Sequence, residues 1–321
     1  MRTGSATGAA NMDDVAGKLW STDSTVRIDA IDKLSEMAGE TAVQALLGVL
    51  GDNQWNIRWS AVQALGKIGD PTAVIPLCSS LEDGNEQVRK AAASSLARLR
   101  DPRSVIPLCS SLEDGNEEVR RAAASSLARL RDPRSVGPLI QALRDPSEDV
   151  REAAATALGW IGGSHAVDLL INALRDEESE VRGWAANCLG RIGDRRALDP
   201  LIDTLNDEDS KVRLRAVRAL GWIGDPGAVG PLVLALGEDD TAVLESLSIA
   251  LDLMDVEGLR RQGSEHHMSY FSRALRHGNS QARRHLISVL GKIGTPEAMK
   301  VLYDAGVHSA ASATLRNASA E

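Results

Sequence analysis

Apolar residues recur along this chain with two periods, one inside a helix and one between repeats. The pair Val150-Arg151 has a counterpart every 31 residues along most of the chain. A fixed period of this length predicts a solenoid of stacked repeats, because one short unit cannot bury its apolar face alone. Within residues 148–162 the apolar side chains with the spacing of one helix face are Val150, Ala154, Ala155, Leu158 and Ile161. The other pairs are Val26-Arg27, Ile57-Arg58, Val88-Arg89, Val119-Arg120, Val181-Arg182 and Val212-Arg213, with Val243-Leu244 and Ala282-Arg283 as variants.

A second, shorter helix is expected before the helix that carries each Val-Arg pair. Residues 132–143 begin with Asp132, a typical N-cap, and Pro133, which is favoured at the first helical position. A further proline, Pro138, has counterparts in four other repeats. Because a proline inside a helix removes a backbone hydrogen bond, we expect a bend there. Each repeat is therefore a hairpin of helix A and helix B, and Gly162 ends helix B.

The string PLI-AL-D…VR--AA--ALG-IGD in these repeats resembles HEAT repeats of the short, bilin-lyase type. The resemblance runs from about Val26 to Met299. It implies an all-α fold, a right-handed α-α superhelix of about nine helical hairpins with a partial C-terminal cap. We expect residues 12–306 to form a single HEAT-like solenoid with an insertion in 255–270. Residues 1–11 are predicted to be a disordered extension, and residues 307–321 a C-terminal cap or frayed tail.

HEAT repeats carry an aspartate in the turn between the helices and an arginine six residues later. The resemblance implies a ladder of charge-assisted hydrogen bonds between neighbouring repeats, which would satisfy turn groups otherwise buried unpaired. The pattern fails at Ser21/Arg27, Glu238/Leu244 and His277/Arg283, where we expect less regular stacking. The ladder residues are Asp52, Arg58, Asp83, Arg89, Asp114, Arg120, Asp145, Arg151, Asp176, Arg182, Asp207 and Arg213.

The composition suits thin, stacked helices. Aromatic residues make up 3% of the chain, so the core must be aliphatic. The sequence predicts no membrane span and no secretion signal. Three cysteines, Cys78, Cys109 and Cys188, indicate a reducing compartment, and we expect a cytoplasmic protein. Cys78 and Cys109 share a column with isoleucines, so we interpret them as small buried side chains.

Function is expected where the repeats differ. Counted from the valine of each pair, positions +4, +5, +8 and +11 are apolar, whereas +2, +3, +6 and +10 vary. The resemblance implies that helix B lines the concave side, so the variable positions would form its inner surface. These positions carry ten Lys or Arg against five Asp or Glu in a chain of net charge −9. A basic inner face attracts an acidic partner.

Tryptophan and arginine are prominent at these variable positions. Both are enriched at binding hot spots, because each buries a large area and keeps a hydrogen-bond donor. Core tryptophan would occupy an apolar column, so we expect these tryptophans to lie on the inner surface. The predicted binding residues are Trp59, Lys67, Arg98, Arg129, Trp160, Trp184, Asn187, Arg191, Arg215, Arg218 and Trp222.

Signals of catalysis are poor. The chain has no glycine-rich phosphate loop after a strand, and no Cys-x-x-Cys or His-x-x-x-His spacing. Deoxyhypusine hydroxylase, built of similar repeats, binds iron through His-Glu dipeptides, and this chain has none. We expect no cofactor and no metal, with His266 and His267 as a weak candidate pair.

Three functions are compatible with these observations. The first is a non-enzymatic scaffold that binds an acidic protein or peptide segment on the inner surface. The second is a bilin lyase or chromophore-handling protein, in which cations beside tryptophans would hold a tetrapyrrole. The third is a nucleic-acid-binding HEAT-like protein, which the pI near 5.3 disfavours. The sequence leaves the oligomeric state open.

Overall fold

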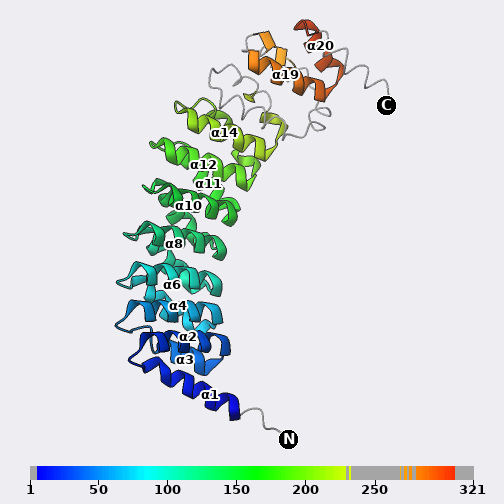
Figure 1. The fold of residues 1–321 in the computed structure, drawn as a ribbon. Coiled ribbons are helices and arrows are strands. Elements are labelled where there is room, and N and C mark those ends of the chain that lie inside the picture. The colour runs from blue at the N-terminus through cyan, green and yellow to red at the C-terminus, as the bar shows by residue number, and fades with distance from the viewer. Residues whose placement is uncertain are drawn as a thin grey trace. The chain divides into compact units, whose positions relative to one another are not determined.

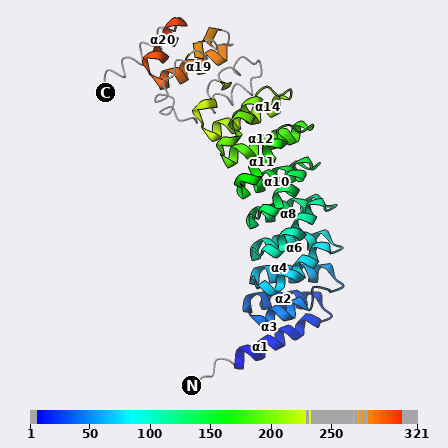
Figure 2. The same ribbon diagram turned by 180° about the vertical axis from the view of Figure 1, so that it is seen from behind.

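A computed structural model describes residues 6–228, 231–232, 268, 271–272, 275–276 and 280–307. In these residues every element is an α- or 3₁₀-helix. The predicted α-solenoid is confirmed, because hairpins follow one another along the chain and, within each unit, successive described B helices pack side by side (Figures 1 and 2). Contacts divide the chain into two compact units, Met1–Ile161 and Gly162–Glu321, where the sequence predicts one solenoid.

The first unit contains five hairpins. Its α-helices are α1 (Ala6–Gly17), α2 (Ser24–Met37), α3 (Glu40–Leu47), α4 (Trp55–Ile68), α5 (Val74–Ser79), α6 (Glu86–Leu99), α7 (Val105–Ser110), α8 (Glu117–Leu130), α9 (Val136–Gln141) and α10 (Glu148–Ile161). Its 3₁₀-helices are η1 (Lys18–Trp20), η2 (Pro71–Ala73), η3 (Ser80–Glu82), η4 (Pro102–Ser104), η5 (Ser111–Glu113), η6 (Pro133–Ser135) and η7 (Ala142–Arg144). The B helices are α2, α4, α6, α8 and α10.

The second unit repeats this pattern in the part that the structure describes. Its α-helices are α11 (Gly163–Ala173), α12 (Ser179–Ile192), α13 (Leu198–Thr204), α14 (Ser210–Ile223), α19 (Ser280–Ile293) and α20 (Pro296–Asp304). Its 3₁₀-helices are η8 (Arg195–Ala197) and η9 (Pro226–Ala228). Helices α12 and α14 are packed against each other as successive B helices. The predicted insertion in 255–270, apart from Met268, and the tail after Val307 lie outside the described residues.

The prediction of a disordered extension over residues 1–11 is wrong for residues 6–11. These residues form the first part of α1, which contacts α2 and α3. The segment contains alanines, the best helix formers. The same helix continues to Val15, and Leu19 follows it, and both side chains are buried. The buried Val15 in α1 and Leu19 in η1 anchor this end of the chain against the following helices, which the small residues of 6–11 alone did not indicate.

Within residues 6–228, helix A is split where it contains the internal proline. Asp132 Oδ1 accepts the N–H of Arg134 at 2.9 Å, which confirms the N-cap, and a 3₁₀ turn follows. Pro138 has no N–H to donate to the carbonyl four residues earlier, so the α-helical ladder cannot extend back through it. The result is η6, α9 and η7 in place of one bent helix. Helix α11 has no proline and runs unbroken for 11 residues.

Successive B helices approach closely at small residues. A Cβ at Gly66 of α4 would lie within 2.3–2.9 Å of Ser95 on α6. The Ser95 hydroxyl, in turn, donates to the carbonyl of Val62 at 3.0 Å. In the second unit, a Cβ at Gly190 would lie 2.5 Å from the Cα of Ala219. These contacts keep neighbouring repeats at a constant, short separation.

The arginine ladder joins each repeat to the next. Arg89 Nε and Nη2 donate to the carboxylate of Asp114 at 2.7 and 2.9 Å, and Nη1 donates to the carbonyl of Asp83 at 2.8 Å. Asp114 also accepts the N–H of Asn116, which closes its own turn. Arg89 therefore ties the turn of its own repeat to the turn of the following one. The same carboxylate pairing is made by Arg58 with Asp83, Arg120 with Asp145, and Arg182 with Asp207.

The ladder begins one repeat earlier than predicted. Arg27, whose own repeat has Ser21 in place of aspartate, forms an ion pair with Asp52 and is buried. Its Nε donates to the carbonyl of Leu19 at 2.6 Å, which replaces the missing turn contact. The irregularity at Ser21 therefore does not remove the stacking contact, because the carboxylate comes from the following repeat.

The arginines of the second half of the ladder also bind the carbonyl of the aspartate in their own repeat. Arg151 Nη1 donates to the Asp145 carbonyl at 2.7 Å. Equivalent bonds run from Arg182 to the Asp176 carbonyl and from Arg213 to the Asp207 carbonyl, both at 2.9 Å.

The ladder lowers the pKa of its carboxyl groups. Hydrogen bonds from Arg27 and Arg58 hold the pKa of Asp52 and of Asp83, respectively, below the ordinary value, although burial opposes the shift. The carboxylate form is therefore stabilised in the folded state, and the ladder contributes stability only while these groups are ionised.

Removing one ladder cation should destabilise the fold. We expect Arg89→Ala to lower the free energy of unfolding by about 1–3 kcal/mol, because Asp114 loses its partner in a partly buried site. The matched control is Arg98→Ala on the same helix, which should change stability by less than about 0.5 kcal/mol because Arg98 is exposed. Urea unfolding followed by circular dichroism measures both, and equal losses would contradict the assignment.

The ladder also predicts the acid dependence of stability. The folded-state pKa of Asp83 lies below its unfolded value of about 3.9, so its contribution is complete above about pH 4 and is lost as pH falls through the folded-state pKa. Urea midpoints measured between pH 7 and pH 2.5 should fall more steeply for the natural chain than for Asp83→Asn. Parallel curves would show that this carboxylate does not carry the dependence.

Candidate functional site

Helix B exposes its +10 position to solvent in every repeat of residues 6–228. We call the surface formed by the +2, +6 and +10 side chains of α4, α6, α8 and α10 the B-face. It belongs to the first unit. Its +10 residues are Lys67, Arg98, Arg129 and Trp160, and all are exposed. The +6 positions hold Gln63, Ser94, Ser125 and Thr156, which are short or polar. The B-face therefore combines large cationic or aromatic side chains with small neighbours, which leaves hollows between the helices.

The first of these, the basic hollow, lies between α6 and α8 and encloses about 340 Å³. Its charged lining residues are Lys90, Arg98, Arg121, Arg129 and Glu118, so four cations and one acid give +3. Lys90 Nζ and Arg121 Nη2 each lie 2.8 Å from the Glu118 carboxylate. Their hydrogen bonds lower the pKa of Glu118. Arg98 and Arg129 have no ion-pair partner among the described residues, so two guanidinium groups remain available in this hollow.

The second, the Trp160 hollow, lies between α8 and α10 and encloses about 390 Å³. Arg121 and Arg129 are balanced there by Asp149 and Glu152, so its formal charge is zero. Trp160 is 54% exposed and forms one end. The Arg131 guanidinium carbon lies 5.9 Å from the centroid of its ring, within the range of a cation–π contact. This hollow therefore offers an aromatic surface directly beside the basic hollow.

In the second unit the predicted residues do not all lie on the surface. Arg191, Arg218 and Trp222 are exposed, as expected for the +10 and +6 positions. Trp184 is only 8% exposed, so the prediction that it lies on a binding surface is wrong. The Arg215 guanidinium carbon lies 4.2 Å from the centroid of the Trp184 ring and covers it.

The +3 position explains this burial. Trp184 and Arg215 occupy +3 in successive repeats, and equivalent residues of adjacent B helices stack. Gly183 makes room for the stacking, because a Cβ there would lie 2.9 Å from Arg215 Nη1. Arg215 and Asn187 are accordingly half-buried, and Trp184 Nε1 and Asn187 Oδ1 are buried without a hydrogen-bond partner. The +3 column therefore belongs to the packing between helices.

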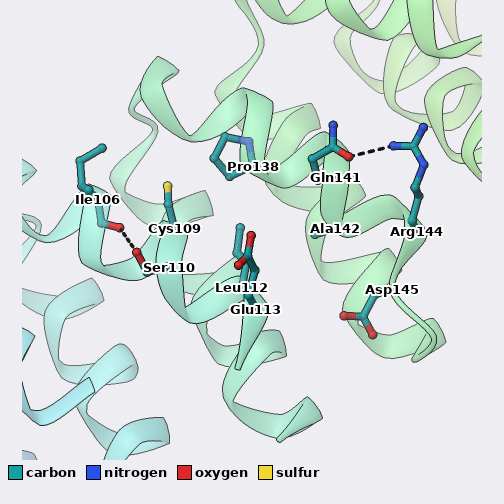
Figure 3. A pocket seen from close by; sticks show the side chains of 10 residues that line it. All are labelled: Ile106, Cys109, Ser110, Leu112, Glu113, Pro138, Gln141, Ala142, Arg144 and Asp145. Carbon is teal, nitrogen blue, oxygen red and sulfur yellow. Dashed lines mark hydrogen bonds between the residues drawn. The ribbon is translucent and has the colours of Figure 1, made fainter. Parts of the chain in front are cut away.

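The A helices carry a hollow of their own, of about 530 Å³ between α7 and α9 (Figure 3). Ile106 and Cys109 lie on one side of it and Pro138 and Gln141 on the other. Cys109 is half-buried, as is Cys78, where the sequence predicts full burial. Burial raises the pKa of the Cys109 thiol to about 11, which makes it a poor nucleophile at neutral pH.

Sequence reasoning missed four residues that matter here. Lys90 and Arg121 line the basic hollow from the +2 column. Arg100 and Arg131 follow the ends of α6 and α8, at a position where most of the other repeats have glycine and the first has Ala38. The replacement of that glycine by arginine in two repeats was the signal that would have identified them.

The described residues contain no group of three or more histidine, cysteine, aspartate or glutamate side chains placed to bind a metal ion. The candidate pair His266 and His267 lies outside them. No helix among the described residues has both the length and the apolar character needed to cross a bilayer.

The two kinds of tryptophan should respond differently to truncation. We expect Trp184→Ala to lower the free energy of unfolding by about 3–5 kcal/mol, because its buried ring leaves a cavity beneath Arg215. Trp160→Ala, which removes a largely exposed ring, should cost less than about 1 kcal/mol. Urea unfolding of both variants tests this, and a large loss in the Trp160 variant would place that ring in the packing.

Comparison with known proteins agrees with this architecture. The closely packed helical hairpins match a family model described as HEAT repeats over residues 18–97, 73–128, 105–179 and 167–252. No curated protein matches the chain. Importin beta has the same fold, with a TM-score of 0.61 at 16% identity over 90% of this chain and 48% of that one.

Two further structures are similar but superpose less well. The complex of CpcE and CpcF of phycocyanin lyase from Nostoc sp. PCC7120 gives a TM-score of 0.40 at 25% identity, covering 78% of this chain and 94% of that one. Human deoxyhypusine hydroxylase gives 0.39 at 24% identity, covering 78% and 98%. The matches to the family model together span residues 18–252, well over half of the sequence. The resemblance seen in the repeats is thereby confirmed, and the chain belongs to the HEAT-repeat family.

Proposed function

We propose that this protein is a non-enzymatic scaffold whose B-face binds an acidic segment of a protein partner. The observation that carries the proposal is the basic hollow between α6 and α8. It has a formal charge of +3 in a chain of net charge −9, and Arg98 and Arg129 extend into it without an acidic partner. Two unpaired guanidinium groups in one hollow favour a carboxylate ligand, because the bidentate arginine–carboxylate bond is strong.

The Trp160 hollow supports a partner that is not purely acidic. Its formal charge is zero, and Trp160 offers an exposed aromatic surface one repeat away from the basic hollow. An apolar side chain of the partner would bury area against Trp160 while its neighbouring carboxylate contacts Arg98 and Arg129. Aromatic and arginine side chains at the centre of an interface contribute most of the binding energy. The expected ligand therefore carries acidic residues next to an apolar one.

A nucleic acid fits this surface less well. Its backbone carries a negative charge at every nucleotide, so a strand that crosses both hollows would meet Asp149 and Glu152 in the second. A peptide can place its carboxylates in the basic hollow and an uncharged residue beside Trp160. The charge pattern of the two hollows thus favours a peptide over a strand.

The thiols agree with an intracellular scaffold. Cys78, Cys109 and Cys188 form no disulfide, as is usual in a reducing compartment such as the cytoplasm. Cys188 is fully buried, and burial raises its thiol pKa to about 12. Its role is in packing, and we assign no binding role to it.

Charge reversal on the B-face should abolish binding. The probe is a fluorescein-labelled ten-residue peptide with four glutamates and one phenylalanine, measured by fluorescence anisotropy in 50 mM salt. We expect Arg98→Glu with Arg129→Glu to weaken binding at least 100-fold, because two favourable contacts become repulsive. The matched control, Lys211→Glu with Lys300→Glu, changes the net charge equally at exposed sites of the second unit and should leave the affinity unchanged.

Two results would overturn the proposal. One is an equal loss in the matched control, which would mean that only net charge matters. The other is tighter binding of a ten-nucleotide single-stranded DNA, or of biliverdin detected by its absorbance, than of the peptide. A peptide with glutamine in place of glutamate should bind at least tenfold more weakly.

A further inference from the structure

Each described B helix is followed by a residue with a positive φ, the left-handed backbone conformation. Among the described B helices this residue is a glycine in five repeats, at Gly69, Gly162, Gly193, Gly224 and Gly294, with φ between 57° and 78°. In the first repeat it is Ala38, with φ 51°. In two repeats it is an arginine: Arg100 has φ 53° and Arg131 has φ 52°. A residue with a Cβ is disfavoured there, because the Cβ crowds the neighbouring carbonyl oxygen, whereas glycine is not.

The fold does not require arginine at this position. The N–H of Gly69 donates to the carbonyl of Leu65 at 3.0 Å, and the N–H of Arg100 donates to the carbonyl of Leu96 at 3.2 Å, so both residues close the helix by the same bond. Arg100 is exposed and has no ion-pair partner among the described residues. Its side chain therefore contributes nothing visible to the packing that would offset the unfavourable backbone. Ala38 shows that a Cβ is tolerated at this position, so it is the exposed, unpaired cation of Arg100, rather than the backbone alone, that calls for a functional reason.

The side chain of Arg131 shows which residues a long side chain at this position can contact. Its guanidinium carbon lies 5.9 Å from the Trp160 ring, so a cation at this position reaches the +10 residue of the following repeat. Residues 72–102 and 103–133 differ at only four of 31 positions, and the backbones of Arg100 and Arg131 agree within 3° in φ and ψ. The +10 residue that follows Arg100 is Arg129. With the same reach, the Arg100 side chain would extend towards Arg129, and neither arginine has an ion-pair partner among the described residues.

We propose that Arg100 and Arg131 are ligand-binding residues, and that Arg100 adds a third guanidinium group to the carboxylate held by Arg98 and Arg129. This deepens the proposed function and rests on it. Arg131 lies over Trp160, where it orients the indole and meets the next acidic residue of the same segment. Both arginines lie at the C-terminal ends of helices, where the helix dipole favours a cation and the anion must be held by the guanidinium groups themselves.

The repeat spacing sets the spacing of acidic residues in the ligand. Packed helices lie about 8–10 Å apart, and an extended peptide advances about 3.3 Å per residue. Two carboxylates that reach equivalent cations in successive repeats are therefore about three residues apart. A ligand with glutamates at positions i and i+3 should bind more tightly than one with the same glutamates adjacent.

Replacing the two arginines by glycine separates fold from function. In Arg100→Gly with Arg131→Gly, we expect the thermal midpoint to rise by about 2–4 °C per substitution, because glycine relieves the left-handed backbone. Affinity for the glutamate–phenylalanine peptide should fall at least tenfold. Arg100→Asn with Arg131→Asn, which tolerates the same backbone without the charge, should behave alike. Arg100→Lys with Arg131→Lys keeps the charge and should retain more affinity than either.

The outcomes separate this inference from the function it rests on. Glycine variants that are more stable and bind the peptide as tightly as the natural chain would overturn the role of Arg100 and Arg131. The scaffold proposal would still stand if charge reversal at Arg98 and Arg129 weakens peptide binding. Glycine variants that are less stable would show that the arginines serve the fold, which also overturns the inference. If the charge reversal at Arg98 and Arg129 has no effect either, both proposals fail.

Discussion

The bond between an arginine on one B helix and an aspartate in the next turn is the contact on which this structure depends. Arg89, for example, binds the carboxylate of Asp114 and the carbonyl of Asp83 with one guanidinium group. The planar, five-donor geometry of arginine makes this possible, and a lysine could not contact both turns in this way. Because every carboxylate also closes its own turn, the charge pair and the local turn form together.

Close approach of the B helices gives the ladder its regular spacing. Gly66 and Gly190 let neighbouring backbones lie nearly in contact, so equivalent side chains are repeated at short intervals along each unit. In the first unit this regularity gathers Arg98 and Arg129 in one hollow with Trp160 in the next. The chemistry of the B-face is therefore a consequence of packing at positions that carry no charge.

Most of the fold could be predicted from the sequence, because period, caps and the aspartate–arginine pair are local and repeated. The +10 column was likewise predicted to face solvent, and Arg98, Arg129 and Trp160 do. Trp184 could not be placed by column alone, since its burial depends on Arg215 in the next repeat and on the absence of a side chain at Gly183. The helix at residues 6–11 was not predicted because these residues are small. The side chains that anchor this end of the chain, Val15 and Leu19, come later in the sequence.

The two nearly identical repeats, 72–102 and 103–133, have a consequence for how such a chain changes over generations. Arg58 meets Asp83, and Asp114 presents the same turn to Arg89. A recombination event that removes or adds one whole copy would join partners that already fit each other. Unequal crossing-over could thus lengthen or shorten the array in whole steps without passing through a misfolded ancestor.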